Sequence, residues 1–268
     1  MKGLTYTSSW GVMREGFSEF TYGFALTNEI VSLNPVLSVP IFPSLVEEGR
    51  GAGYDVRLDQ PGRALFIQFK LSRLVRGRRA IEFQNKEFYA PFYRMSFRAR
   101  SRSRQHDLLL DLEQQNKGGV YYFAPAFHTL AKLNECFERR TAAQNSRRVR
   151  PSDVNIPDDR QEHWLSFQAA TGGDVYVHSE EGQKIEMDER PFAIVLAEER
   201  EMLSPERPLE SELETLLNWF QEMDLLRRTR EFGPMETSRP LLLAHVAEAA
   251  QLLLGATLFI VQDRDRKG

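Results

Sequence analysis

Three side chains suited to phosphate chemistry fall within one short stretch of the sequence. Residues 53–72 read "GYDVRLDQPGRALFIQFKLS" and contain Asp55, Gln68 and Lys70. Carboxylate and amide oxygens are ligands that Mg²⁺ accepts in proteins. A lysine ammonium can orient or deprotonate an attacking water, or stabilise the negative charge that develops on a phosphate. These residue types therefore indicate a magnesium site for phosphodiester chemistry, provided that the fold brings them together.

The alternation of side chains along a strand explains how they could meet. In the predicted strand 65–71, Gln68 and Lys70 share the face opposite to the one carrying most of the apolar residues. We expect residues 54–58 to pair antiparallel with this strand across a four-residue loop. Asp55 then lies directly opposite Gln68, with Lys70 one step diagonal. The alternative interpretation is a half-exposed hairpin in which Gln68 and Lys70 simply face water.

The elements around this hairpin form a short α/β unit. A helix is predicted over 18–32, with Ser18 as its N-cap. A helix over 105–116, a strand over 120–127 and a helix over 129–140 follow the hairpin. The order is therefore helix, hairpin, helix, strand, which predicts a mixed α/β (α+β) fold.

The rest of the chain is predicted to form a second α+β region. Residues 142–153 are interpreted as an exposed linker. Beyond it we expect two strands around Gly172-Gly173, a strand at 191–199, helices over 209–228 and 240–254, and a last strand at 256–263. The prediction is a core over 1–138 and an acidic C-terminal α+β region over 151–268, of unknown role and packed on the core.

The motif Asp55, then a hydrophobic strand ending in Gln68-x-Lys70, after a helix that bears a glutamate, resembles the PD-(D/E)xK nuclease superfamily. The Gln form resembles its Mrr-type restriction-endonuclease branch. The resemblance implies a restriction-endonuclease-like core, in which a central mixed sheet is flanked by helices, and phosphodiester hydrolysis with Mg²⁺ or Mn²⁺. It implies the following site residues: Asp55, Gln68, Lys70 and Glu29 as catalytic residues, and Asp55, Gln68, the backbone carbonyl of Phe69, Glu29 and Glu48 as metal ligands. Because Gln68 is neutral, one carboxylate is missing from the metal site, so the metal affinity is either weaker or restored by Glu29 or Glu48.

The charge is unevenly distributed along the chain. Residues 1–69, 70–150 and 151–268 carry net charges of about −2, +11 and −12. Arginine, whose planar fork suits phosphates, supplies most of the positive charge. The predicted nucleic-acid-binding residues are Arg73, Arg76, Arg78, Arg79, Arg98, Arg100, Arg102, Arg104 and Gln105. The alternative interpretation of these arginines is solubility and genome composition.

The sequence thus predicts a metal-dependent endonuclease, acting on DNA rather than RNA, in prokaryotic antiviral defence or restriction. The alternative is a weak or inactive nuclease-like nucleic-acid-binding subunit of a multiprotein defence complex, with the acidic C-terminal region docking a protein partner. The sequence shows no transmembrane or secretory pattern, and Cys136 is predicted to be a core thiol in a cytoplasmic protein.

Overall fold

The computed structural model describes residues 12–13, 16–34, 36–41, 59–116, 119–157, 159–178, 182–203, 207–223 and 239–262. The chain divides into two compact units. Unit 1 comprises residues 1–29, 69–110 and 121–191, and unit 2 comprises residues 30–68, 111–120 and 192–268. We describe each unit by itself. The protein is a mixed α/β protein, as the sequence predicts.

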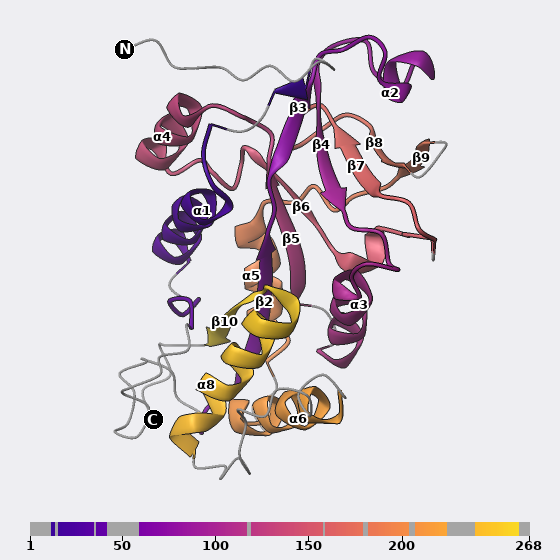
Figure 1. Cartoon of the computed structure of the whole chain (residues 1–268). Helices are drawn as coiled ribbons and strands as arrows, with labels where there is room; N and C mark the ends of the chain where they lie inside the picture. Colours follow the sequence, from indigo (N-terminus) through magenta and orange to yellow (C-terminus); the bar gives the residue numbers. More distant parts are fainter. Residues whose placement is uncertain are drawn as a thin grey trace. The chain divides into compact units, whose positions relative to one another are not determined.

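Two sheets organise the described chain (Figure 1). The antiparallel sheet has the order β1-β3-β4-β7-β8-β9. Its strands are β1 (Val12–Met13), β3 (Ser72–Val75), β4 (Phe92–Phe97), β7 (His163–Phe167), β8 (Val175–His178) and β9 (Gly182–Ile185). The mixed sheet has the order β10-β2-β5-β6, formed by β10 (Thr257–Gln262), β2 (Gly62–Phe69), β5 (Val120–Pro125) and β6 (Ser146–Val149).

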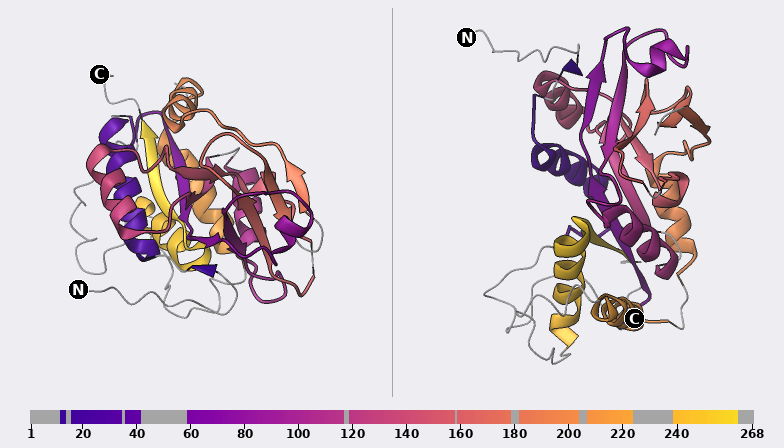
Figure 2. Two further views of the ribbon diagram at one scale, coloured as in Figure 1. Left: turned by 90° about the horizontal axis from the view of Figure 1, so that it is seen from above. Right: turned by 45° about the vertical axis from the view of Figure 1, so that its right-hand side comes forward.

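The helices are α1 (Glu19–Leu33), α2 (Ile81–Gln84), α3 (Gln105–Gln115), α4 (Leu130–Arg139), α5 (Phe192–Glu201), α6 (Leu209–Glu222) and α8 (Arg239–Ala249). A short 3₁₀ turn covers Pro151–Asp153, and a π-helical turn over Ala250–Leu254 extends α8. Within unit 1, α1 and α4 lie side by side (Figure 2). The described helices include none that is long and apolar enough to cross a bilayer.

Helix α1 begins as its sequence predicts, but its apolar residues do not all face the core. The Ser18 hydroxyl accepts a hydrogen bond from the Thr21 amide at 3.0 Å, which confirms the N-cap. Tyr22 and Leu26 are buried against the core, whereas Phe20 and Phe24 are exposed. The apolar residues of this helix therefore do not form one core-facing stripe, and the two phenylalanines stand on its outer surface.

The predicted hairpin is wrong. Gly62 and Arg63, expected in its loop, belong to β2 and pair with Gln262 and Val261 of β10. The strand on the other side of β2 is β5, which runs parallel to it. The Phe66 amide of β2 donates to the carbonyl of Gly119, the residue before β5. Both edges of β2 are thus occupied by other strands. The expected partner strand, residues 54–58, lies outside the described residues.

Three further predictions fail for identifiable reasons. The expected linker 142–153 contains β6, a strand whose four residues are all buried. The expected strand 191–199 is helix α5, because a short apolar run fits either element and its acidic continuation favours a helix. The aromatic strand β4 was not foreseen, since polar residues interrupt its apolar ones. By contrast, the strands around Gly172-Gly173 are confirmed as β7 and β8, and the last strand as β10.

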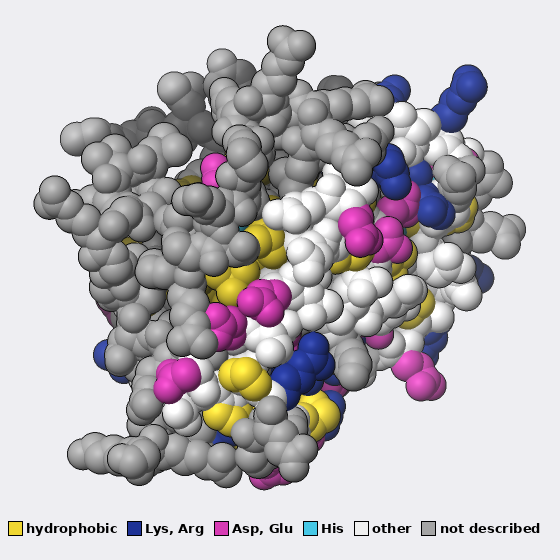
Figure 3. Space-filling view, turned by 90° about the horizontal axis from the view of Figure 1, so that it is seen from below, with side chains coloured by type: hydrophobic (Ala, Val, Ile, Leu, Met, Phe, Trp, Pro, Cys, Tyr) yellow, Lys and Arg dark blue, Asp and Glu magenta, His cyan; other side chains and the backbone are white. Residues whose placement is uncertain are grey.

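The surface in Figure 3 shows acidic, basic and hydrophobic side chains interspersed. Among the described residues of this face, the acidic side chains form no continuous patch. Cys136 is buried, as predicted.

Candidate active site at the end of strand β2

Lys70 lies where the chain leaves the mixed sheet for the antiparallel one. Strand β2 ends at Phe69 and β3 begins at Ser72. The Lys70 amide donates to the Phe123 carbonyl at 2.8 Å, which fixes the backbone there. The half-buried side chain extends toward α3, where its ammonium donates to Gln105 Oε1 at 3.3 Å and lies 5.8 Å from the ring centre of Tyr122.

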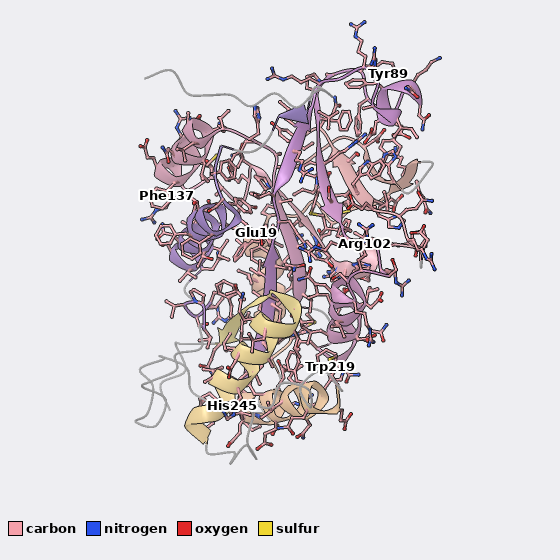
Figure 4. The ribbon with its side chains drawn as sticks, viewed as in Figure 1. Glu19, Tyr89, Arg102, Phe137, Trp219 and His245 are labelled. Atoms are coloured by element: carbon pink, nitrogen blue, oxygen red, sulfur yellow. The ribbon has the colours of Figure 1, made fainter. Side chains whose placement is uncertain are left out.

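The negative charge of Glu19, the first residue of α1 (labelled in Figure 4), acts on the Lys70 ammonium. Burial lowers the pKa of Lys70, the opposite charge of Glu19 raises it in part, and Arg98 lowers it further. Burial raises the pKa of Glu19, against the effect of Lys70. Burial is the largest cause of both shifts, and such shifts occur at functional sites and in structural ion pairs alike. The sequence predicts Glu29 and Glu48, not Glu19, as the glutamates of this site. A local pattern does not show which glutamate of α1 influences Lys70.

A buried histidine, His106, hydrogen-bonds to Tyr122 in this region. His106 Nε2 lies 3.1 Å from the Val154 carbonyl, and its Nδ1 lies 2.9 Å from the Tyr122 hydroxyl. Because a carbonyl only accepts, the neutral ring carries its proton on Nε2 and accepts from Tyr122 at Nδ1. Burial lowers the pKa of His106 to about 4. His106 is therefore a neutral structural residue that orients Tyr122.

Gln68 is buried in unit 2 rather than exposed to water. It is 3% exposed, and its amide donates to the carbonyl of Leu254 at 2.9 Å. The side-chain oxygen Oε1 is buried and has no hydrogen-bond partner among the described residues. The alternative interpretation of Gln68 as a water-facing residue is therefore wrong. An unpartnered buried oxygen is costly unless a ligand satisfies it.

The predicted carboxylates are placed unevenly. Asp55 and Glu48 lie outside the described residues. Glu29 is buried in α1, and its carboxylate accepts hydrogen bonds from the backbone amides of Ala142 and Ala143, the latter at 3.2 Å. This carboxylate caps the turn after α4, and its hydrogen bonds with these backbone amides give it a structural role. The prediction that Glu29 belongs to the catalytic site is not supported by its position.

Replacing Glu29 tests this structural role. Glu29→Ala should lower the free energy of unfolding by about 1–3 kcal/mol, because two backbone amides lose their acceptor. Urea denaturation measures the loss. The matched control is Glu138→Ala on the exposed surface of α4, which should change stability little. Equal stabilities of Glu29→Ala and wild type would contradict the structural role.

The arginines predicted to contact nucleic acid differ in their solvent exposure and in their protein partners. Seven of the eight arginines predicted to contact nucleic acid are exposed, namely Arg73, Arg76, Arg78, Arg79, Arg98, Arg102 and Arg104. Arg100 is the exception, because its guanidinium lies 2.8 Å from Asp107 and donates to the Ile156 carbonyl. We therefore withdraw Arg100 as a phosphate contact. Gln105 accepts a hydrogen bond from Lys70. The contact of Gln105 with nucleic acid stays a prediction.

A second polar cluster of unit 1 is buried in the antiparallel sheet. Glu82 is fully buried and accepts hydrogen bonds from Arg94, from the Trp164 indole at 2.8 Å and from the Ser166 hydroxyl at 2.6 Å. The Arg94 guanidinium also stacks on Trp164, 4.6 Å from its ring centre. His178 stacks on the same indole at an interplanar angle of 6°. We name these residues the Glu82 network.

The described residues contain no group of three or more His, Cys, Asp or Glu side chains arranged to hold a metal ion. No family model, curated protein or solved structure matches this chain.

Proposed function

We propose that the protein is a metal-dependent nuclease with a restriction-endonuclease-like core, in which Lys70 acts on the phosphodiester. The observation that carries the proposal is the Lys70 ammonium, held half-buried by Gln105 beside Glu19. The order of α1, β2, β3, β4, α3 and β5 along the chain agrees with such a core, although β3 and β4 belong to the antiparallel sheet and β2 and β5 to the mixed one. In this proposal the substrate is DNA rather than RNA, and the biology is antiviral defence or restriction.

In this proposal Lys70, Gln105, Glu19 and the exposed arginines have different roles in the reaction. Lys70, in its charged form, stabilises the negative charge that develops on the phosphate, because a fixed charge in a partly desolvated site acts strongly. Gln105 holds the lysine in position, and Glu19 keeps the ammonium protonated by its opposite charge. Exposed arginines such as Arg98 contact the flanking phosphates.

The proposed metal ion is Mg²⁺ or Mn²⁺. The Oε1 of Gln68, which has no hydrogen-bond partner among the described residues, would suit such a hard cation, because it prefers oxygen ligands. The further proposed ligands are the backbone carbonyl of Phe69 and, outside the described residues, Asp55 and Glu48, but the hairpin register no longer places Asp55 opposite Gln68. When bound, the ion would supply Lewis acidity at a phosphate oxygen.

Plasmid cleavage tests the proposal. Supercoiled plasmid DNA is incubated with the protein in Mg²⁺ or Mn²⁺, and in EDTA as control. Relaxed or linear DNA should form only with the metal, and Asp55→Ala should abolish it. Cleavage that persists in EDTA, or that Asp55→Ala leaves unchanged, would contradict the metal site.

Gln68 offers a prediction with a readout other than cleavage. In Gln68→Glu the donor to the Leu254 carbonyl is lost and a carboxylate faces that carbonyl, so the metal-free protein should be less stable by about 1–3 kcal/mol. A divalent ion that binds there should then raise the melting temperature of the variant more than that of wild type. Gln251→Glu on the exposed side of the π-helical turn is the control. Equal shifts in all three proteins would contradict a metal ligand at Gln68.

The second candidate is a nucleic-acid-binding subunit that does not cleave. Two observations favour it: Gln68 is neutral and its amide is already engaged by Leu254, and Glu29 is engaged by backbone amides. DNA binding without metal-dependent cleavage, together with a stable complex through the acidic C-terminal region, would favour this candidate.

A further inference from the structure

An exposed tyrosine and several basic side chains share one short segment of unit 1. We name residues 76–91, between β3 and β4, the β3–β4 arm. Tyr89 in this arm is 82% exposed. Figure 4 shows it beside α2, at the outer end of the arm. A single exposed aromatic ring needs no explanation by itself, so the inference depends on the charge carried by the same segment.

A small hydrophobic cluster holds the arm in shape. Phe88 stacks on Phe92, with ring centres 4.9 Å apart, and meets Tyr176 edge-on. The cluster is formed by Val75, Phe88 and Phe92, with Ala80, Phe83 and Tyr176 packed against it. Arg76, Arg79 and Tyr89 are each the direct chain neighbour of a cluster member. Their backbone positions are therefore fixed by one common core while their side chains stand in solvent.

The exposed charge of the arm is positive. Its two acidic residues turn inward, because Glu82 lies in the Glu82 network and Glu87 lies 3.1 Å from buried His178. The exposed basic residues are Arg76, Arg78, Arg79 and Lys86. No described acidic side chain forms an ion pair with any of these four. A polyanion is the complementary partner of such a surface.

We propose that the β3–β4 arm binds unpaired nucleotides, with Tyr89 stacking on a base and the arginines contacting the neighbouring phosphates. The inference rests on the proposed function, since it names the substrate form on which that site acts. A base inside a duplex has both faces covered by its neighbours, whereas an unpaired base offers a free face to an aromatic ring. The arginines of the same arm supply the phosphate contacts that every strand needs.

Fluorescence anisotropy in EDTA tests the inference, with a labelled single-stranded oligonucleotide and the matching duplex as probes. Tyr89→Ala should weaken binding of the single strand by about tenfold, the usual contribution of one stacked base. It should leave duplex binding unchanged. Tyr89→Phe, which keeps the ring, should bind the single strand as wild type does. The matched control is Phe20→Ala on α1, because Phe20 is also 82% exposed.

Two results would overturn the inference: wild-type affinity of Tyr89→Ala for the single strand, or an equal loss in Phe20→Ala. Melting temperatures of the variants should match that of wild type, since neither ring is buried. The assay distinguishes this inference from the nuclease proposal because it needs no cleavage. Tyr89-dependent binding by a protein that never cleaves would refute only the nuclease. Cleavage without Tyr89-dependent binding would refute only the arm.

Discussion

Lys70→Ala should lower metal-dependent cleavage of DNA by about 10²–10³-fold, the usual loss when one preorganised charge or donor is removed from a reaction site. The side chain is half-buried and does not belong to the buried core, so the variant should fold. Plasmid cleavage under single-turnover conditions gives the rate. The matched control is Lys132→Ala, which removes a half-exposed lysine of α4 that pairs with Glu135. An unchanged rate in Lys70→Ala would remove Lys70 from the mechanism.

The pH dependence of cleavage identifies the form of Lys70 that acts. Burial lowers its pKa below the ordinary value near 10.5, so the ammonium loses its proton at lower pH than a free lysine would. If the charged form stabilises the phosphate, the rate should fall as the pH rises through this lowered pKa. A rate that rises there would instead assign Lys70 the role of base. Glu19→Gln removes the negative charge that raises the pKa of Lys70. The fall in rate should therefore begin at lower pH in this variant than in wild type.

Glu82→Ala should cause the largest loss of stability of any single change considered, about 3 kcal/mol or more. The substitution leaves Arg94 without its buried partner and removes the acceptor of the Trp164 indole and the Ser166 hydroxyl. Urea denaturation measures the loss. The control is Asp174→Ala, which breaks the exposed pair with Lys184 and should cost less than about 1 kcal/mol. A similar cost for both variants would contradict the account of the Glu82 network.

Acid titration gives an independent check on Glu82. Burial alone would raise its pKa, but hydrogen bonds from Arg94 and Ser166 and the charge of Arg94 outweigh burial and lower it below the ordinary value near 4.5. A carboxyl group with a lowered folded-state pKa stabilises the protein above its unfolded pKa and loses that contribution as the pH falls through the folded value. The difference in stability between wild type and Glu82→Gln should therefore shrink below about pH 4.5.

Local signals in the sequence predicted many elements but not their partners. Ser18 marks the start of α1, and Gly172-Gly173 marks the turn between β7 and β8, because caps and turns depend on neighbouring residues. The strand that pairs with β2 could not be predicted from neighbouring residues. Strand β10 lies almost 200 residues further along the chain, and an alternating pattern does not say which distant strand will pair.

The candidate site was predicted in part for the same reason. The Q-x-K pattern singled out Lys70 and Gln68, since polar residues in an apolar strand need a partner, and the structure buries Gln68 and half-buries Lys70. The pattern could not show that the charge of Glu19, rather than that of Glu29, affects the pKa of Lys70. Both glutamates lie on α1, and only the tertiary packing of that helix decides which end faces the lysine.

The most direct test of the central claim is a crystal structure of the protein soaked with Mn²⁺, with anomalous scattering used to locate the ion. The account predicts an anomalous peak within about 2.0–2.6 Å of Gln68 Oε1, with Asp55 and the Phe69 carbonyl as further ligands. A fully ordered structure in which Gln68 Oε1 is satisfied by a protein group, with no manganese beside it, would contradict the account.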